Sequence, residues 1–263
     1  MNLAGRSVLL TGATGGLGHA IARRLRAAGA ELVLTGRRTE VLEPLAAETG
    51  ARSLAVDLAD ADAVARLAAE YGDVDVLVSN AGLPGTGQLS TFSVEEIDRA
   101  LAINLRAPMV LSRVLGERMA ARGRGHIVLI SSLSGKSGQA GSAIYSATKF
   151  GLRGLAQSMR EDLRPSGVGV SAIFPGFVRD AGMFHDTGTK LPPGVGTVSP
   201  QDVAEAVVRA IERNRGEVDV ATVGLRAGAK AAGLAPDLAA TVQRKLGGQR
   251  IAEDHVSAQT TKR

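Results

Sequence analysis

The 263-residue sequence predicts an α/β fold, with one doubly wound, mostly parallel sheet of six to seven strands and helices on both faces. Three observations lead to this prediction. Short apolar runs alternate along the chain with longer stretches that carry a helical stripe of apolar residues. The runs are apolar throughout, which is typical of parallel strands covered on both faces. A glycine-rich turn follows the first run at once, as expected where a strand turns tightly into a helix.

The strands are expected at the apolar runs, with helices between them. The predicted strands are Ser7–Thr11, Glu31–Thr35, Arg52–Val56, Val74–Ser79, His126–Ser131, Val168–Phe174 and Val218–Thr222. A helical stripe of Leu17, Ile21, Leu25 and Ala28 follows the first strand. Further helices are expected at Val94–Ala121, Tyr145–Leu163, Pro200–Arg213 and Pro236–Leu246.

The composition excludes several classes of protein. The chain has no Cys, which removes disulfides, thiolate nucleophiles and Cys-ligated metal sites, and no metal site is expected. It has no Trp and only 3% aromatic residues, which argues against a surface that stacks nucleic-acid bases. No stretch reads as a transmembrane helix, and the N-terminus lacks the apolar core of a signal peptide. We therefore expect a cytoplasmic protein without a membrane span.

The formal net charge of +5 lies mostly near the C-terminus. From Ala221 onward seven Lys and Arg residues stand against three Asp and Glu residues. A basic region of this kind can contact an anionic partner or membrane surface. Because no dense basic run is present, we interpret it as a solvated helical tail that frays from about Arg250.

The first predicted strand runs into a loop with the sequence Thr11-Gly-Ala-Thr-Gly-Gly-Leu-Gly18. A dinucleotide pyrophosphate requires glycines for a tight turn and for close backbone approach, followed by the N-terminus of a helix. This strand–turn–helix context supplies all three, so the fold is predicted to be of the Rossmann type. The residues predicted to surround the pyrophosphate are Gly12, Thr14, Gly15, Gly16, Leu17 and Gly18.

Ligands of such sheets bind at the carboxyl ends of the strands, which sorts the candidate side chains. His126 and Tyr71 precede their strands and should lie at the opposite edge. The other tyrosine, Tyr145, stands four residues before Lys149, on the same face of a helix. A nearby ammonium lowers the pKa of a tyrosine, and bringing it from about 10 to about 7 takes roughly 4 kcal/mol. Taken alone, the pair also fits an amphipathic tyrosine beside a solvated lysine.

Several motifs in order resemble the classical short-chain dehydrogenases/reductases, from about Leu3 to Val223. Thr11–Gly18 looks like the cofactor loop of that family, and Pro175-Gly176 like its turn beside the nicotinamide. The other matching motifs are Asn80-Ala81-Gly82, Asn104, Ile130-Ser131-Ser132 and Tyr145-x-x-x-Lys149. Ser79 and Asp180 depart from the pattern, standing where relatives often have Asn and Thr.

The resemblance implies roles for individual residues. Tyr145 would be the general acid/base, Lys149 would lower its pKa and bind the nicotinamide ribose, and Ser132 would hold the substrate oxygen. Asn104 would position a water in a proton relay. Around the cofactor, the resemblance implies contacts from Asp57 and Leu58 at the adenine, from Asn80, Ala81 and Gly82, and from Pro175, Gly176 and Val178. Substrate contacts are expected from Leu133, Phe177, Met183 and Phe184.

The same resemblance suggests how the chain is organised. Residues 1–223 would form an NAD(P)-binding domain that includes a substrate loop at 177–199. Residues 224–263 would form a basic, helical C-terminal extension with disordered last residues. Relatives usually associate through the long helices that correspond here to Val94–Ala121 and Tyr145–Leu163. We therefore expect a homotetramer, or a dimer if the extension covers one face.

The end of the second strand indicates which cofactor is preferred. An NAD enzyme usually has an acidic residue there, but this chain has Gly36 followed by Arg37 and Arg38. A guanidinium can pair with a 2′-phosphate, so NADP(H) is favoured over NAD(H). Gly15 is evidence against this preference, because many NADP-preferring relatives have a second basic residue there.

The leading functional hypothesis is hydride transfer between NADP(H) and a carbonyl or secondary alcohol of a small or medium, apolar substrate. Two alternatives remain open. One is an epimerase or dehydratase that holds its NAD(P) tightly, because Thr11–Gly18 also fits the T-G-x-x-G-x-x-G spacing of the extended branch. The other is a nucleotide-binding scaffold without turnover, which the presence of Ser132, Tyr145, Lys149 and Asn104 together disfavours.

Overall fold

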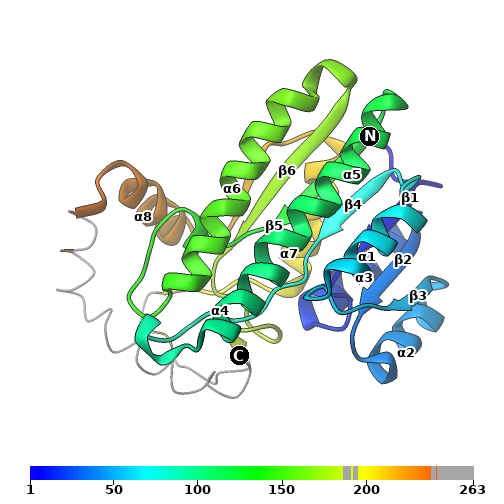
Figure 1. Ribbon diagram of the computed structural model, residues 1–263. Helices are drawn as coiled ribbons and strands as arrows, with labels where there is room; N and C mark the ends of the chain where they lie inside the picture. Colours follow the sequence, from blue (N-terminus) through cyan, green and yellow to red (C-terminus); the bar gives the residue numbers. More distant parts are fainter. Residues whose placement is uncertain (186–190, 192–194, 238–240, 242–263) are drawn as a thin grey trace.

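A computed structural model describes residues 1–185, 191, 195–237 and 241, and their strands form one seven-stranded sheet (Figure 1). The strand order is β3-β2-β1-β4-β5-β6-β7, and every neighbouring pair is parallel. The strands are β1 (Ser7–Leu10), β2 (Glu31–Gly36), β3 (Arg52–Ala55), β4 (Val76–Ser79), β5 (Gly125–Ile130), β6 (Val168–Pro175) and β7 (Glu217–Val220). The predicted fold class is therefore confirmed.

Helices connect successive strands and begin at residues suited to that position. The helices are α1 (Gly16–Ala27), α2 (Thr39–Thr49), α3 (Ala61–Glu70), α4 (Val94–Leu101), α5 (Ala107–Ala121), α6 (Ala143–Leu163), α7 (Pro200–Glu212) and α8 (Val223–Leu234). Ser93 and Ser199 cap α4 and α7 in reciprocal capping boxes, which pair backbone N–H groups that the first turn leaves free. Gly50, with a φ of 65°, ends α2 in the left-handed conformation.

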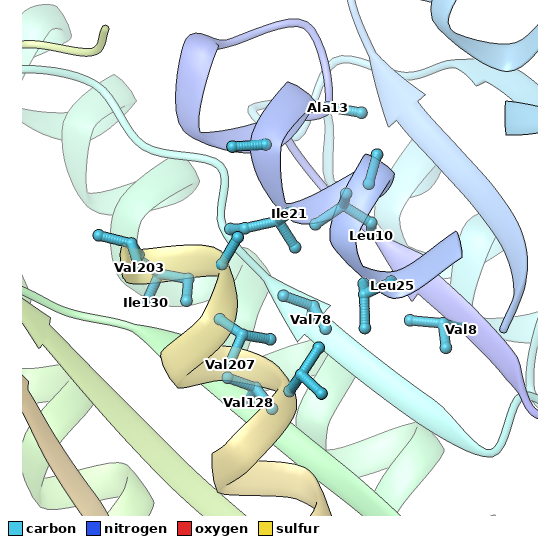
Figure 2. Close-up of a cluster of buried hydrophobic side chains, with 14 of the residues drawn as sticks. Val8, Leu10, Ala13, Ile21, Leu25, Val78, Val128, Ile130, Val203 and Val207 are labelled. Atoms are coloured by element: carbon cyan, nitrogen blue, oxygen red, sulfur yellow. The ribbon is translucent and has the colours of Figure 1, made fainter. Parts of the chain in front are cut away.

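The sheet separates two hydrophobic layers because successive strand residues point to opposite faces. Val8 and Leu10 of β1 join the layer under α1, α2 and α7, whereas Leu9 between them joins the layer under α3, α5 and α6. Figure 2 shows the first layer, where Ile21 and Leu25 of α1 and Val203 and Val207 of α7 meet side chains of β1, β4 and β5. Both faces are covered at the inner strands, which explains why β1, β4, β5 and β6 show no polar alternation.

One predicted helix needs correction. The span Val94–Ala121 is helical throughout, but a π-helical segment, Ala102–Arg106, separates α4 from α5. Pro108 has no N–H to donate to the carbonyl of Asn104, four residues before it, so the regular hydrogen-bond ladder fails there. Segments of this kind are frequent at functional sites, and Asn104 lies inside this one.

The C-terminal region differs from the sequence prediction as well. Helix α8 follows β7 almost at once, although its small residues gave no apolar stripe in the sequence. Most of the predicted helix Pro236–Leu246 and the end from Arg250 lie outside the described residues. Among the helices that the structure describes, none is both long and apolar enough for a membrane span.

The strand order reverses between β1 and β4, which defines where a ligand binds. In open parallel sheets, the crevice lies at the carboxyl ends of the strands at this switch point. The chain leaves β1 into the glycine loop, β4 into Asn80, β5 into Ser131 and β6 into Gly176. His126 lies in the amino-terminal part of β5, and Tyr71 precedes β4, so both are at the opposite edge as predicted.

Candidate active site

The glycine loop lies against the segment that follows β4. A β-carbon on Gly12, whose φ is +67°, would come within 2.6 Å of the Ala81 Cα atom, and one on Gly18 within 2.3 Å of the Gly12 carbonyl oxygen. Asn80 fastens the two segments, because its Nδ2 atom donates to the carbonyls of Thr11 and Gly12 at 3.2 and 3.0 Å. A β-carbon on the exposed Gly15 would lie 3.6 Å from the Gly12 carbonyl oxygen, an ordinary van der Waals contact. A side chain at Gly12 or Gly18 would therefore clash within the tight turn. The start of α1 stays accessible to an anion.

The start of the predicted substrate loop covers part of this glycine loop. A β-carbon on Gly16 would lie 2.4 Å from the Ala181 Cβ atom, and one on Gly182 would lie 3.8 Å from Leu17 Cγ. Asp180, just before them, has a φ of 66° and pairs with its neighbour Arg179 at 3.4 Å. Residues 181 and 182 thus lie against the glycine loop.

The two serines after β5 have different surroundings. Ser131 is buried, and its hydroxyl donates to the carbonyl of Lys149 at 2.9 Å. Ser132 is half-buried, and its Oγ atom accepts from the N–H of Ser134 at 3.1 Å, at the start of a 3-10 turn, Leu133–Gly135. Ser131 therefore joins β5 to α6, and Ser132 presents its hydroxyl toward Tyr145, with which it hydrogen-bonds.

Lys149 is buried beside the end of β5. Its Nζ atom donates to the carbonyl of Ile130 at 2.9 Å and lies 5.5 Å from the ring centroid of Tyr145. Burial lowers the pKa of Lys149 to about 8. Because an ammonium has three donors, this hydrogen bond leaves Lys149 with donors for a ligand.

The expected lowering of the Tyr145 pKa is not what the protein's own groups produce. Burial raises the pKa of Tyr145, and the hydrogen bond with Ser132, which lowers it, does not compensate. Desolvation disfavours the phenolate more strongly than one neighbouring hydroxyl favours it. Lys149, on which the sequence prediction relied, does not reverse this upward shift of the Tyr145 pKa.

Asn104 connects the π-helical segment to the loop after β4. It is fully buried, its Oδ1 atom accepts from the N–H of Leu83 at 2.6 Å, and its Nδ2 atom donates to the Leu83 carbonyl at 2.9 Å. A β-carbon on Gly82 would lie 3.5 Å from Asn104 Oδ1, 3.7 Å from Lys149 Nζ and 3.7 Å from Met183 Cε. The amide, the ammonium and a predicted substrate residue therefore converge on Gly82.

Apolar side chains line the other side of the site. Phe177 and Phe184 lie with ring centroids 4.9 Å apart, and Val178 is buried and bridges to Val198. A β-carbon on Gly176 would be 3.4 Å from Leu133 Cδ1 and 3.6 Å from Leu225 Cδ1. Sequence reasoning missed Leu225, because it left the role of α8 open. The helix therefore contributes a side chain beside the Pro175-Gly176 turn.

The end of β2 provides positive charge near the glycine loop. The Nη2 atom of Arg38 donates to the carbonyl of Thr14 at 2.6 Å, and Arg37 is exposed beside it. Thr14 also sits against Gly36, where a β-carbon would come within 2.5 Å of its Cγ2 atom. The Arg38 guanidinium therefore lies at the glycine loop, and Arg37 and Arg38 directly follow β2.

The predicted adenine residues lie one strand further out. Burial of Asp57 raises its pKa, but the N–H of Ala59 and the guanidinium of Arg99, 3.2 Å away, outweigh this, so that pKa is lowered overall. Leu58 is buried in the layer under α3. Because the ionised Asp57 carboxylate is already paired with Arg99, it competes only weakly with an anionic ligand for Arg37 and Arg38.

Comparison with known proteins decides the family. The chain matches the model of the short chain dehydrogenases over residues 6–192. It is a short-chain dehydrogenase/reductase. Ketoacyl reductase HetN of Nostoc sp. is 38% identical over 227 residues, which cover 83% of this chain and 79% of that protein. The 3-oxoacyl-acyl-carrier-protein reductase FabG of Rickettsia bellii is 32% identical over 216 residues, covering 79% and 89%.

Solved structures agree with this short-chain dehydrogenase/reductase assignment. A short-chain dehydrogenase from Sphingobium yanoikuyae in complex with NADPH superposes with a TM-score of 0.75 at 28% identity, covering 81% of this chain and 87% of that one. A metagenomic short-chain oxidoreductase in complex with NADP gives a TM-score of 0.69 at 37% identity, covering 84% and 98%. The chain is accordingly an NAD(P)-dependent oxidoreductase acting on CH–OH groups.

The residues of this short-chain dehydrogenase/reductase fit an NAD(P) cofactor. The glycine cradle leaves no room for a β-carbon at Gly12 and Gly18, and Gly15 leaves the entrance open. The Lys149 ammonium and the guanidiniums of Arg37 and Arg38 are donors of the type that ribose and phosphate groups require. Among residues 1–185, 191, 195–237 and 241, no group of three His, Asp or Glu side chains is placed to hold a metal ion.

Proposed function

We propose that the chain is an NADP(H)-dependent carbonyl reductase or alcohol dehydrogenase in which Tyr145 is the general acid/base. The observation that carries this proposal is the convergence of Ser132, Tyr145 and Lys149, from two elements, at the carboxyl edge of the sheet. Asn104 faces the same position through Gly82. A fold that only needed to be stable would not require all four groups there.

The proton transfer follows from these contacts. Ser132 donates a hydrogen bond to the substrate oxygen and holds it beside the Tyr145 hydroxyl, which gives its proton to a carbonyl or accepts one from an alcohol. Held by the glycine loop, Lys149 and the two arginines, NADP(H) would supply the hydride for reduction or accept it in oxidation. Lys149 places its ammonium near the developing phenolate, where positive charge stabilises the transition state. Burial raises the pKa of Tyr145, so the hydroxyl is protonated before the reaction. The Lys149 charge and the short distance between the Tyr145 and substrate oxygens therefore matter more than prior ionisation of Tyr145.

Arg37 and Arg38 support NADP(H) rather than NAD(H). The contact of Arg38 with the Thr14 carbonyl holds one guanidinium at the glycine loop without using a carboxylate. A 2′-phosphate can therefore approach Arg37 and Arg38 without displacing an acidic partner. The two solved relatives with bound NADPH and NADP are consistent with this preference.

The proposed substrate is a small or medium ketone with an apolar body. Leu133, Phe177, Met183 and Phe184 supply an apolar surface beside the reacting groups, and Leu225 extends it. Relatives named as ketoacyl reductases support carbonyl reduction as the chemistry. The cytoplasmic location expected from the sequence fits a reductase that uses the cellular NADPH pool.

We further propose a homo-oligomer formed through α4, α5 and α6. Leu101, Met109 and Phe150 on these helices are large apolar side chains with exposures of 38%, 45% and 42%. Burying them against a second copy would remove this surface from water. In this proposal residues 1–223 form the nucleotide-binding domain, and the extension from 224 contributes α8 to the substrate side. Light scattering should show a dimer or tetramer, and a species of only about 27.0 kDa would contradict it.

The test of the proposed activity follows the absorbance of NADPH and NADH with simple ketones, a 3-oxoacyl thioester and secondary alcohols. The proposal predicts NADPH consumption with at least one ketone, and a higher kcat/KM with NADPH than with NADH. No net consumption with any carbonyl, together with tightly retained nucleotide, would favour the epimerase alternative. Cofactor binding without any turnover would favour a scaffold.

A further inference from the structure

A buried ion-pair network lies behind the Ser132 segment and was not expected from the sequence. The Nζ atom of Lys136 is 2.5 Å from Asp219 Oδ1 and 2.7 Å from Glu217 Oε2, both on β7. The side chains of Lys136 and Asp219 are only 7% and 8% exposed. The Lys136 ammonium also lies 3.9 Å from the centroid of the Phe174 ring on β6. Three groups thus hold one buried ammonium.

One of these acidic residues, Glu217 of β7, also holds helix α6. Glu217 accepts from Arg153 Nε at 2.7 Å and from Gln157 Nε2 at 2.8 Å. Arg153 stands one helical turn after Lys149, and Gln157 stands one turn further. Lys136 connects the network to Ser132. Ser132 caps the start of the 3-10 turn and Lys136 follows its end, where the Lys136 N–H donates to the carbonyl of Leu133. Strand β7 is therefore tied to both segments that carry the reacting groups.

The segment between Ser132 and Lys136 also packs closely on α6. A β-carbon on Gly135 would lie 2.6 Å from the carbonyl oxygen of Lys149 and 2.6 Å from Ser131 Oγ. Because Gly135 has no side chain that could adjust to a shift, the ion pairs of Lys136 determine the position of the turn relative to α6. A shift of the turn would move Ser132 relative to Tyr145 directly.

We propose that Lys136 is a positioning residue: through Asp219 and Glu217 it locks the Ser132 turn to β7, which holds the Ser132 hydroxyl at Tyr145. This inference rests on the proposed function only for its effect on turnover, and its geometric part stands without it. Buried ion pairs often stabilise a fold no better than apolar side chains of similar size. A role in placing Ser132 explains why a lysine is buried here at all. Displacements of about 1 Å can reduce turnover by up to about 100-fold.

The decisive experiment titrates Tyr145 itself. The chain has two tyrosines and no Trp, so Tyr71→Phe leaves Tyr145 as the sole source of a tyrosinate absorbance signal. The hydrogen bond with Ser132 lowers the pKa of Tyr145, so movement of Ser132 should raise it. In this background, Lys136→Met combined with Asp219→Leu replaces the pair by apolar side chains and leaves Glu217 with Arg153. Lys149, the charge nearest Tyr145, is unchanged.

We expect the Tyr145 titration of the double variant to move upward and kcat with an accepted ketone to fall about 10- to 100-fold, while the NADPH dissociation constant stays within about threefold. The matched control is Arg24→Met with Glu205→Leu, which removes a 2.6 Å ion pair between α1 and α7. It should leave the titration in place. An unchanged Tyr145 titration in the folded double variant, or an equal shift in the control, overturns the proposal.

If the double variant does not fold, Asp219→Asn decides the question. Its amide oxygen can still accept from Lys136, and Glu217 still balances the ammonium, so the fold should persist. A smaller upward shift of the Tyr145 titration supports the proposal, and no shift overturns it. The titration needs no substrate, so failure of the proposed reductase activity and failure of this inference are separate results.

Discussion

The two edges of the sheet both contain buried titratable groups, yet they differ in what those groups are free to do. At the amino edge, His126 Nε2 pairs with Ser171 Oγ at 2.8 Å, and Asp75 meets Arg6 and Arg124 at 3.6 and 3.3 Å. At the carboxyl edge, Lys149 donates to the Ile130 carbonyl at 2.9 Å as its one hydrogen-bond partner among the described residues, and Tyr145 hydrogen-bonds with Ser132. The first edge uses its polar groups to join strands, and the second leaves donors available.

The pKa shifts express the same difference. Burial, with smaller contributions from the N-terminal ammonium and Arg160, lowers the pKa of His126 to about 3, so the ring is neutral near pH 7. Burial lowers the pKa of Lys149 only to about 8, which leaves the ammonium protonated near neutrality. Burial alone therefore does not mark a functional group. A titratable group with unused hydrogen-bonding capacity at a strand's carboxyl end does.

The largest expected effect comes from removing the charge at the carboxyl edge. Lys149→Ala should lower kcat about 1000-fold, because general acid/base catalysis by Tyr145 loses the adjacent positive charge. It should also raise the KM for NADPH. Lys149→Arg should restore part of the activity, since it keeps a charge with a different shape. Steady-state kinetics check this, and near-parental activity of Lys149→Ala would remove Lys149 from the site.

The arginines after β2 should affect cofactor choice rather than chemistry. Arg38→Ala or Arg37→Ala should weaken NADPH binding about 10- to 100-fold, the loss of about 1.5–3 kcal/mol expected for a charge-assisted hydrogen bond. NADH binding should change little. Arg52→Ala, on the first residue of β3 at the amino edge, is the control. Equal losses for the two cofactors in a fluorescence titration would place the 2′-phosphate elsewhere.

Helix α8 should affect substrate choice by a smaller factor. Leu225→Ala should change the relative kcat/KM of large and small ketones about three- to tenfold, because it removes apolar contact beside Gly176. Leu234→Ala on the same helix, 88% exposed, is the matched control. If both variants keep the parental preference over a series of ketones, α8 does not line the substrate pocket.

His126 should change stability with pH and leave activity intact. Its folded pKa of about 3 lies below the ordinary histidine value of 6.5, so the unfolded chain binds the proton first as the pH falls. The stability is fully present above pH 6.5 and is lost toward pH 3. The free energy of unfolding should fall by about 2 kcal/mol between pH 6.5 and pH 5. His126→Gln, which cannot titrate, should show a smaller drop in urea unfolding, and an equal drop would exclude this histidine as the cause.

The sequence was sufficient for the parts of the molecule that local patterns determine. The strands, the glycine loop and the assignment of His126 and Tyr71 to the far edge follow from apolar runs and chain direction. The π-helical segment at Asn104 arises because Pro108 has no N–H for the Asn104 carbonyl. The spacing of apolar residues in the sequence does not reveal this local change of helix type. No sequence pattern predicts the burial of Lys136, because its partners on β7 lie more than eighty residues away in sequence. The predicted lowering of the Tyr145 pKa was wrong, because burial raises this pKa more than the neighbouring groups lower it. The degree of burial is visible only in the structure.

The central claim is that Tyr145 transfers the proton, and Tyr145→Phe tests it most directly. The substitution keeps the ring in place and removes only the hydroxyl. The account predicts that kcat for ketone reduction falls about 10²- to 10⁴-fold, while the NADPH dissociation constant stays close to the parental value because the glycine loop and both arginines are untouched. Near-full turnover by Tyr145→Phe would contradict the account, since the other tyrosine, Tyr71, lies at the opposite edge of the sheet.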